Sequence, residues 1–203
     1  MRIGVFGGTF DPIHVGHLVA AMNAHYTLEL DRVLMVVAHV PWQKVGTREI
    51  TPSEVRLAMV EASVETLDGL EASSLEIDRG GDSYTVDTVE EIAATNPDAE
   101  IYLIVGSDVA PTLDTWHRHE DLRQMARLAI VDRPGSVAAK PPPEWTYEMV
   151  EAPLIDLSST QLRARMVERR PVRFLVPDPA LAPYLDWWDR THAEGVSRVT
   201  DAK

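Results

Sequence analysis

The sequence predicts a single-domain α/β protein with a doubly wound, Rossmann-like parallel sheet. Short apolar runs rich in β-branched residues recur along the 203 residues and are typical of buried strands. Segments with apolar residues at helical spacing separate them, and strand, helix, strand in that order implies parallel crossover units. Glycine-rich and polar segments directly follow the strands. This places them at the carboxyl edge of the sheet, where open α/β folds bind ligands.

The composition narrows the class of protein. The chain has no cysteine, which excludes disulfides, thiolate catalysis and zinc-thiolate sites, and its formal net charge is −13. Such a charge argues against binding to nucleic acid or to anionic membranes. No signal peptide or membrane-spanning stretch is evident, so we expect a soluble, cytoplasmic protein. We expect one domain over residues 1–193 and a flexible tail over 194–203.

The first strand, residues 2–6, leads into a loop that begins with Gly7 and Gly8. The spacing then predicts a helix from about Val15 to Leu30. Free N–H groups at a helix start favour an anion. His14 and His17, three residues apart, would share one face of the first turn, where both could bind the same phosphate. The alternative is a metal site made of both histidines and Asp11, but no further ligand cluster lies nearby.

The segment Gly7-Gly8-Thr9-Phe10-Asp11-Pro12-Ile13-His14-Val15-Gly16-His17 resembles the signature of the HxGH nucleotidyltransferase superfamily. Its form is most similar to that of the bacterial nicotinate-nucleotide adenylyltransferases, and the resemblance extends through Leu185. It implies transfer of the adenylyl group of ATP to nicotinate mononucleotide, a step of NAD biosynthesis. It also implies that His14 and His17 contact the transferred group. ATP would be bound by Gly7, Gly8, Thr9, Phe10 and Asp11.

A second strand over residues 32–38 precedes a loop that contains Lys44. By spacing alone, Lys44 fits a surface cation as well as a site residue. The resemblance implies that it faces the nucleotide phosphates, as a catalytic residue with the two histidines. The family often carries Pro-Pro-His-Lys here, whereas this chain has Pro41-Trp42-Gln43-Lys44, so a histidine role does not carry over. A helix is predicted over residues 52–66, with Arg56 at the surface rather than turned toward the site.

Residues 70–77 are predicted to form a strand, followed by a glycine-bearing loop and a helix over residues 85–95. On sequence alone, Ser83 and Thr85 are more simply explained as helix caps. The resemblance implies instead that Ser83, Tyr84 and Thr85 hold the carboxylate of the pyridine nucleotide.

A strand over residues 100–105 ends at Gly106 and Asp108. A carboxylate at this place suits ribose hydroxyls, and the alternative is a helix cap. Trp116 could stack on a flat base, although tryptophan is more often buried. The resemblance implies that Trp116 is the nicotinate platform and leaves His117 and His119 without a role.

Residues 127–131 are predicted to form a further strand, and the resemblance places Arg133 near the mononucleotide. Residues 135–146 are expected to be a surface excursion before a last strand over 148–155. The next helix begins with Ser158, Ser159 and Thr160, with Arg163 one turn later. Alone this is an N-cap pattern, and the resemblance implies that these residues bind the triphosphate of ATP. A final apolar helix is expected near Tyr184.

Several alternatives stay open at this stage. Related enzymes use nicotinamide mononucleotide, phosphopantetheine or CTP-dependent substrates, and a non-catalytic nucleotide-binding module is a rival of another class. We expect Mg²⁺ to arrive bound to ATP rather than in a cage of protein ligands. The sequence does not fix the oligomeric state, and a homodimer is compatible with it.

Overall fold

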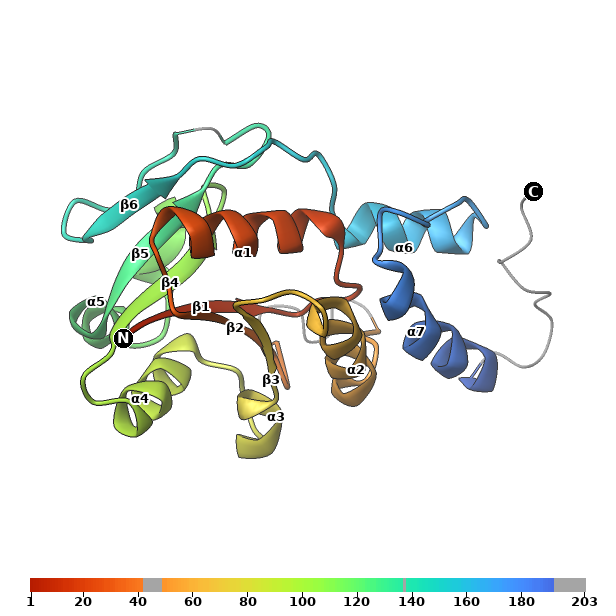
Figure 1. Ribbon diagram of the computed structural model, residues 1–203, viewed down its shortest axis with the longest axis horizontal. Coiled ribbons are helices and arrows are strands. Elements are labelled where there is room, and N and C mark those ends of the chain that lie inside the picture. The colour runs from red at the N-terminus through yellow and green to blue at the C-terminus, as the bar shows by residue number, and fades with distance from the viewer. Residues whose placement is uncertain (42–48, 137, 192–203) are drawn as a thin grey trace.

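The computed structural model describes residues 1–41, 49–136 and 138–191. Its centre is a six-stranded, all-parallel sheet in the order β3-β2-β1-β4-β5-β6 (Figure 1). The predicted doubly wound sheet is therefore confirmed. The strands are β1 (Arg2–Gly8), β2 (Arg32–Val37), β3 (Leu70–Ser73), β4 (Glu100–Gly106), β5 (Ala126–Val131) and β6 (Tyr147–Val150).

The strand order reverses between β1 and β4. From β1 the chain winds outward through β2 to β3, and it then returns to the other side of β1 at β4. The loops after β1 and β4 consequently diverge, and the crevice between them is where doubly wound folds bind ligands.

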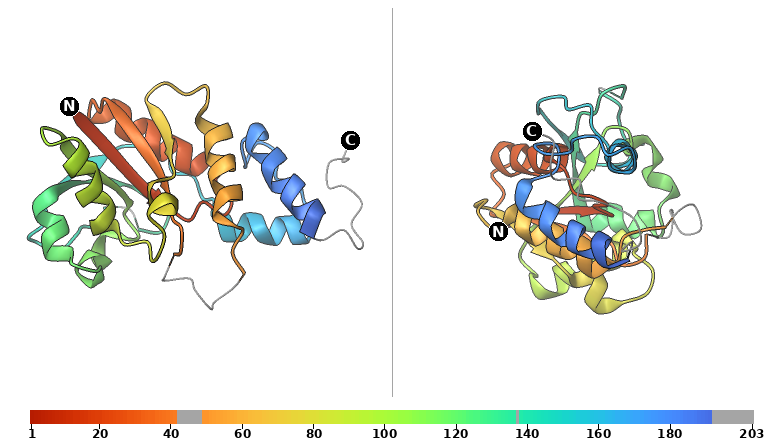
Figure 2. Two further views of the ribbon diagram at one scale, coloured as in Figure 1. Left: turned by 90° about the horizontal axis from the view of Figure 1, so that it is seen from below. Right: turned by 90° about the vertical axis from the view of Figure 1, so that its right-hand side faces the viewer.

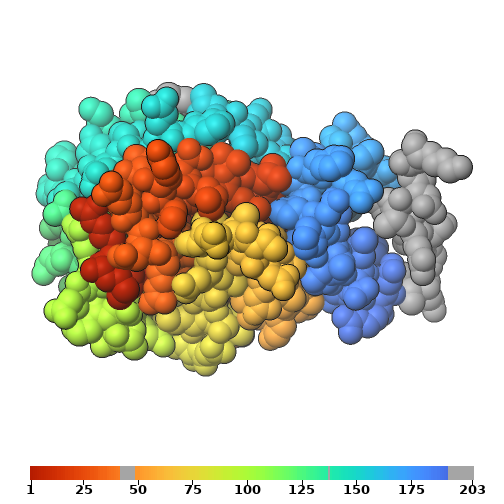
Figure 3. Space-filling view, viewed as in Figure 1, coloured from red at the N-terminus to blue at the C-terminus, as the bar shows by residue number. Residues whose placement is uncertain are grey.

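Helices cover both faces of the sheet, with α1 on one face and α4 on the other (Figures 1 and 2). Their bounds are α1 (Val15–Thr27), α2 (Ser53–Val64), α3 (Leu75–Arg79), α4 (Thr85–Thr95), α5 (His119–Met125), α6 (Ser159–Val167) and α7 (Asp178–Thr191), with a 3₁₀ helix η2 (Ala110–Thr115). The helices α6 and α7 form one end of the molecule, next to α1 and α2 (Figure 3).

The core consists of two hydrophobic layers, one on each side of the sheet. Alternate strand residues point to opposite faces, so Met35 and Val37 join α1, α2, α6 and α7, whereas Leu34 and Val36 join α4, α5 and η2. Because both faces are covered, the central strands are apolar throughout, which explains why they were recognisable as continuous runs.

Three predicted elements need correction. The strand predicted over residues 70–77 ends at Ser73, and Leu75–Arg79 is the short helix α3. In a helix this short, two apolar residues do not distinguish a helical from an alternating period. The last strand is Tyr147–Val150 rather than 148–155. The excursion over 135–146 is also not wholly at the surface, because Trp145 is buried and its indole N–H donates to Asp114 Oδ1 at 2.9 Å.

Among the described helices, none is long and apolar enough to cross a membrane. The tail expected over residues 194–203 lies outside the described residues.

Candidate active site

A pocket of about 750 Å³ lies at the carboxyl edge of the sheet, where the order of the strands reverses. Every predicted site residue that the structure describes lines it. These residues are Gly7, Gly8, Thr9, Phe10, Asp11, His14, His17, Ser83, Tyr84, Thr85, Gly106, Asp108, Trp116, Arg133, Ser158, Ser159, Thr160 and Arg163. The remaining predicted site residue, Lys44, lies outside the described residues.

The loop after β1 is shaped by a glycine packed against an aromatic ring. Phe10 is buried and has a left-handed backbone with φ 48°. Its ring lies so close to Gly8 that a Cβ there would be 2.7 Å from Phe10 Cζ. Only glycine fits this contact, and the ring in turn supports His17 edge-on, with 5.1 Å between ring centroids. Gly8 therefore lets the ring that supports His17 pack against the loop.

His14 and His17 stand together at the start of α1. His14 has extended backbone as the residue before the helix, and the two rings stack with centroids 3.6 Å apart. The backbone N–H of His14 donates to His17 Nδ1 at 3.2 Å. With Nδ1 as the acceptor, the neutral ring of His17 carries its proton on Nε2, which can donate to a ligand. A Cβ at Gly16 would lie 3.1 Å from His14 Nδ1, so the glycine between the histidines keeps the space beside His14 clear.

His14 is buried, with 1% of its surface exposed. Its Nδ1 has no hydrogen-bond partner among the described residues, which is costly for a buried polar atom. Burial, with a smaller contribution from the positive charge of Arg133, lowers the pKa of His14 to about 4. The ring is thus neutral near pH 7 and has one unsatisfied nitrogen at the wall of the pocket.

The start of α6 is attached to the loop after β1. Ser158 is the N-cap and its Oγ accepts from the Gln161 backbone N–H at 3.2 Å, which confirms the capping pattern. Ser159 Oγ donates to the Pro12 carbonyl at 2.9 Å, and Arg163 donates to the Asp11 carbonyl at 2.6 Å. Two segments almost 150 residues apart in sequence therefore form one wall of the pocket.

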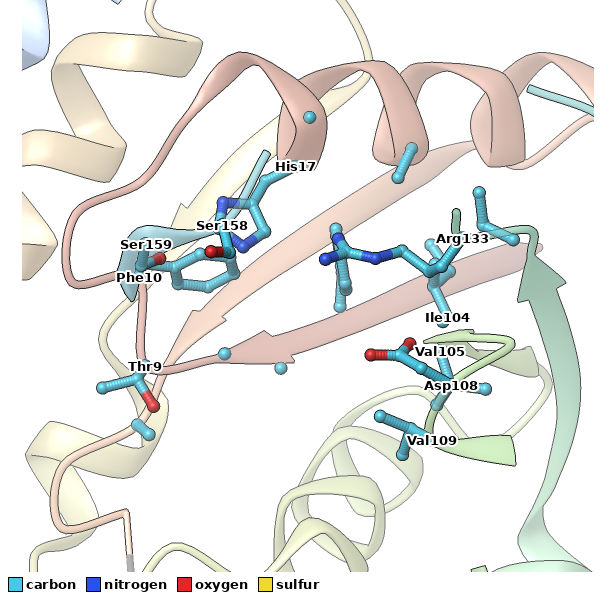
Figure 4. Close-up of a pocket in the computed structure, with 18 of the residues that line it drawn as sticks. Thr9, Phe10, His17, Ile104, Val105, Asp108, Val109, Arg133, Ser158 and Ser159 are labelled. Atoms are coloured by element: carbon cyan, nitrogen blue, oxygen red, sulfur yellow. The ribbon is translucent and has the colours of Figure 1, made fainter. Parts of the chain in front are cut away.

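Arg133 and Asp108 face this wall from the far side of the pocket. In Figure 4 the guanidinium of Arg133 points into the pocket toward His17 and Ser158, above the carboxylate of Asp108. The alternative of Asp108 as a helix cap is wrong, because Val109 occupies the cap position of η2. Gly106 lets the carboxylate of Asp108 lie close to the backbone, since a Cβ at this position would collide with that carboxylate.

Ser83, Tyr84 and Thr85 lie at the start of α4. Ser83 Oγ accepts from the His39 backbone N–H at 2.9 Å, and the Ser83 N–H donates to the Val40 carbonyl at 3.1 Å. Tyr84 is the cap residue, and within the described chain no side chain caps α4. The explanation of Ser83 and Thr85 as mere caps is therefore wrong. Ser83 instead joins this loop to the end of β2.

Trp116 is half-buried and packs against the layer formed by α4, α5 and η2. Next to it, the ring of His117 lies 4.4 Å from that of Tyr84, and both rings line the pocket. No role could be predicted for His117, because a single exposed histidine carries no periodic or motif signal. His119 is the first residue of α5 and does not line the pocket.

Arg56 was expected at the surface, and this expectation is wrong. Only 1% of Arg56 is exposed, and its guanidinium donates to four carbonyls at 2.7–3.2 Å. These belong to Thr9, Ala38, His39 and Thr51. Arg56 thus joins the loop after β1 to both ends of the loop after β2. The spacing in the sequence could have indicated this burial. Arg56 precedes Met59 by three residues and Val60 by four, which places all three on the buried face of α2.

Glu76 is a second buried group that the sequence did not single out. It lines the pocket and accepts a hydrogen bond at 2.6 Å from Oγ1 of Thr88, a residue of α4. It lies in the segment that was predicted as a strand, so no helical stripe indicated its burial.

These features define a nucleotide-binding protein of the nucleotidyltransferase class. The sheet is doubly wound, and a glycine loop leads into a helix that begins with two stacked histidines. Cationic and hydroxyl groups line the facing wall. The comparisons with known proteins agree. The chain belongs to the Cytidylyltransferase-like family, which it matches over residues 5–165, and within it to the nicotinate-nucleotide adenylyltransferases.

Two relatives from different bacteria illustrate the match. A probable nicotinate-nucleotide adenylyltransferase of Corynebacterium kroppenstedtii is 41% identical over 180 residues, 87% of this chain and 85% of the relative. Another, from Gemmatimonas aurantiaca, is 41% identical over 192 residues, which are 91% of this chain and 90% of the relative.

Among solved structures, the nicotinic acid mononucleotide adenylyltransferase of Plasmodium falciparum complexed with NaAD has a similar fold. Its TM-score is 0.77, with 16% sequence identity, and the match covers 92% of this chain and 96% of the other. At this identity the likeness concerns the fold alone.

Proposed function

We propose that this chain catalyses adenylyl transfer from ATP to nicotinate mononucleotide, forming nicotinate adenine dinucleotide and pyrophosphate. The observation that carries the proposal is the stacked pair His14 and His17. The pair lines one pocket together with the hydroxyl and arginine side chains of α6 and the aromatic residues Tyr84 and Trp116. Relatives at 41% identity bear the name of this activity.

The two walls give the pocket two ends. The phosphate end comprises residues 7–11, His14, His17, residues 158–160 and Arg163. The pyridine end comprises residues 83–85, Trp116 and His117. Arg133 and Asp108 lie across the pocket from His17 and Ser158 (Figure 4). They would bind the mononucleotide phosphate and the adenosine ribose.

In the reaction, an oxygen of the mononucleotide phosphate attacks the α-phosphorus of ATP, and the bond to the bridging oxygen of the β-phosphate breaks. Pyrophosphate leaves with the electron pair. The attacking oxygen is already anionic, so no protein nucleophile is required. Catalysis then consists of aligning two anions and stabilising the charge of the transferred group.

His17 suits this role because its Nδ1 accepts the internal bond from the His14 N–H, which places the proton of the neutral ring on Nε2, in a residue that lines the pocket. Neutral His14 adds a second ring next to it, and in the tautomer with the proton on Nδ1 this unsatisfied nitrogen would donate to a bound phosphate oxygen. Arg133 supplies positive charge from the opposite side. Lys44 is assigned to the phosphates by its motif, outside the described residues.

Mg²⁺ is proposed to enter bound to ATP oxygens. It would neutralise part of the triphosphate charge, which the acidic chain requires. In the described parts of the chain, no three His, Asp or Glu side chains gather as a metal site.

Discrimination of the acid is assigned to the start of α4. The N–H groups and the dipole of a helix start favour a carboxylate over a neutral amide. Trp116 would stack on the pyridine ring.

The test is to incubate the chain with Mg-ATP and either nicotinate or nicotinamide mononucleotide, and to measure both pyrophosphate and dinucleotide. We expect a strong preference for the acid. A preference for the amide would contradict the assignment of residues 83–85 but leave adenylyl transfer standing. Binding of ATP with no product from either substrate, or from phosphopantetheine, would contradict adenylyl transfer and favour a non-catalytic module.

A further inference from the structure

The pyridine end is built from two segments that belong to different crossover units. Residues 83–85 begin α4, whereas Trp116 and His117 follow η2. The two segments meet through the rings of Tyr84 and His117, whose centroids are 4.4 Å apart and whose planes are tilted by 32°. A contact of this kind is weak, and it does not involve Trp116 itself. The position of Trp116 therefore depends on other contacts.

The next residue, Arg118, ties this segment to α4. Its guanidinium makes a two-pronged contact with Glu90, with Nη1 to Oε2 at 3.0 Å and Nη2 to Oε1. It also lies 3.5 Å from Asp87 Oδ1, one turn earlier on α4. A bidentate arginine–carboxylate pair fixes orientation as well as distance. Arg118 thus sets where the chain after Trp116 sits relative to the helix start that faces the substrate.

The same side chain is anchored to α5. Arg118 Nε donates to Asp121 Oδ2 at 2.8 Å, and the Arg118 carbonyl accepts from the N–H groups of Asp121 and Leu122. The helices α4 and α5 pack side by side, as Figure 1 shows at one end of the molecule. One residue therefore connects the platform to both helices.

Arg118 has an unusual backbone. Its φ is 49°, in the left-handed region that residues other than glycine rarely adopt. Such a conformation persists where surrounding contacts over-determine it, and it is frequent at binding sites. Here it turns the chain sharply between His117 and α5, and the contacts to three carboxylates hold the turn.

These contacts are near the surface. The Arg118 side chain is 39% exposed, and its carboxylate partners are 36–50% exposed. Exposed ion pairs contribute little to global stability. The hydrogen bonds from Arg118 keep the pKa of Glu90 below its ordinary value, so the pair remains charged at neutral pH. Loss of the network should displace the platform without unfolding the protein.

From this geometry we infer that Arg118 is a positioning residue that holds Trp116 and His117 against α4 and so sets the affinity for the pyridine mononucleotide but not for ATP. Arg118 does not line the pocket, so it acts through its neighbours. The expected change in substrate affinity rests on the proposed function.

The kinetic test uses Arg118→Gln and Glu90→Gln. The second variant breaks the bidentate pair without altering the strained residue. We expect the KM for nicotinate mononucleotide to rise about 10-fold in both, since small misplacements are costly in a positioned site, while the KM for Mg-ATP and kcat stay within about two-fold. Arg118→Lys, which keeps the charge but not the fork, should fall between wild type and Arg118→Gln.

Arg127→Gln is the matched control. Arg127 forms an exposed pair with Glu100 at 2.8 Å, and neither residue lines the pocket. Unchanged KM values in both test variants, an equal rise in both KM values, or a loss of thermal stability well beyond that of the control would overturn the inference.

Hydrogen exchange provides a readout that needs no activity. Amides of residues 116–119 should exchange faster in Arg118→Gln, while those at the start of α1 should keep the wild-type rate. If the wild-type chain makes no dinucleotide, the proposed function fails, yet the exchange data still test the positioning. Unchanged exchange at 116–119 would overturn the inference by itself.

Discussion

The two ends of the pocket are held in place by different kinds of contact. At the phosphate end, His14, Phe10 and Arg56 are all at most 2% exposed, and the loop after β1 is hydrogen-bonded to α2 and α6. At the pyridine end, Trp116 and Tyr84 are half-buried, and Arg118 holds them through exposed carboxylates. In the proposed function, the phosphate chemistry therefore lies on the more buried side, and recognition of the second substrate lies on the more exposed side.

The largest effect should come from Arg56. Replacing Arg56 with Met would leave four carbonyls without their buried donor, so we expect a loss of about 3–5 kcal/mol in the free energy of unfolding, measured by urea denaturation. Arg127→Met, which removes an exposed arginine, should cost less than about 1 kcal/mol. Equal losses for the two variants would show that the buried contacts of Arg56 do not stabilise the phosphate end.

His17 should matter for the rate and not for the fold. We expect His17→Ala to lower kcat by roughly 10²- to 10³-fold, because it removes a donor aimed at the transferred phosphoryl group. Circular dichroism and the unfolding midpoint should stay near those of the wild type. Wild-type turnover in this variant would remove His17 from the mechanism.

His14 should make stability depend on pH. Its folded pKa of about 4 is below the ordinary 6.5, so between these values the unfolded chain binds more protons than the folded one. Stability should therefore fall as pH decreases from about 6.5 to 4, by up to roughly 3 kcal/mol from this group.

Comparison of wild type with His14→Asn isolates this contribution from the carboxylates that titrate in the same range. Urea unfolding at several pH values should give a shallower decline for the variant. Parallel curves would show that His14 is not buried in its neutral form.

The smallest effect on stability is expected at the pyridine end. Arg118→Gln should lower the free energy of unfolding by less than about 1 kcal/mol, because its partners are largely solvated. Thermal unfolding of Arg118→Gln and Arg56→Met, measured side by side, would compare the stability contributed by the two ends of the pocket. A loss as large as that of Arg56→Met would mean that both ends are structural in the same way.

Much of this arrangement could be predicted from the sequence, for identifiable reasons. The central strands are buried on both faces, so their apolar runs stand out, and parallel topology then places the loops after β1, β4 and β5 at one edge. The glycine-histidine segment was informative because several residue types coincided at fixed spacing.

Other features depend on tertiary contacts and left little trace in the sequence. Arg56 was misjudged because an arginine is assumed to be solvated unless its partners are known, and its partners are backbone carbonyls from three separate segments. Leu75–Arg79 was too short for its period to be recognised. The link from Arg118 to Glu90 joins two residues 28 positions apart in the sequence, and no local pattern indicates such a pair.

The most direct test of the account is an experimental structure of the chain with nicotinate adenine dinucleotide bound. We expect the pyrophosphate bridge within hydrogen-bonding distance of His17 Nε2, the pyridine ring on Trp116, and its carboxylate at the start of α4, against Tyr84 and Thr85. A dinucleotide bound in the opposite direction, with adenine on Trp116, or one that leaves both histidines without contact, would contradict it.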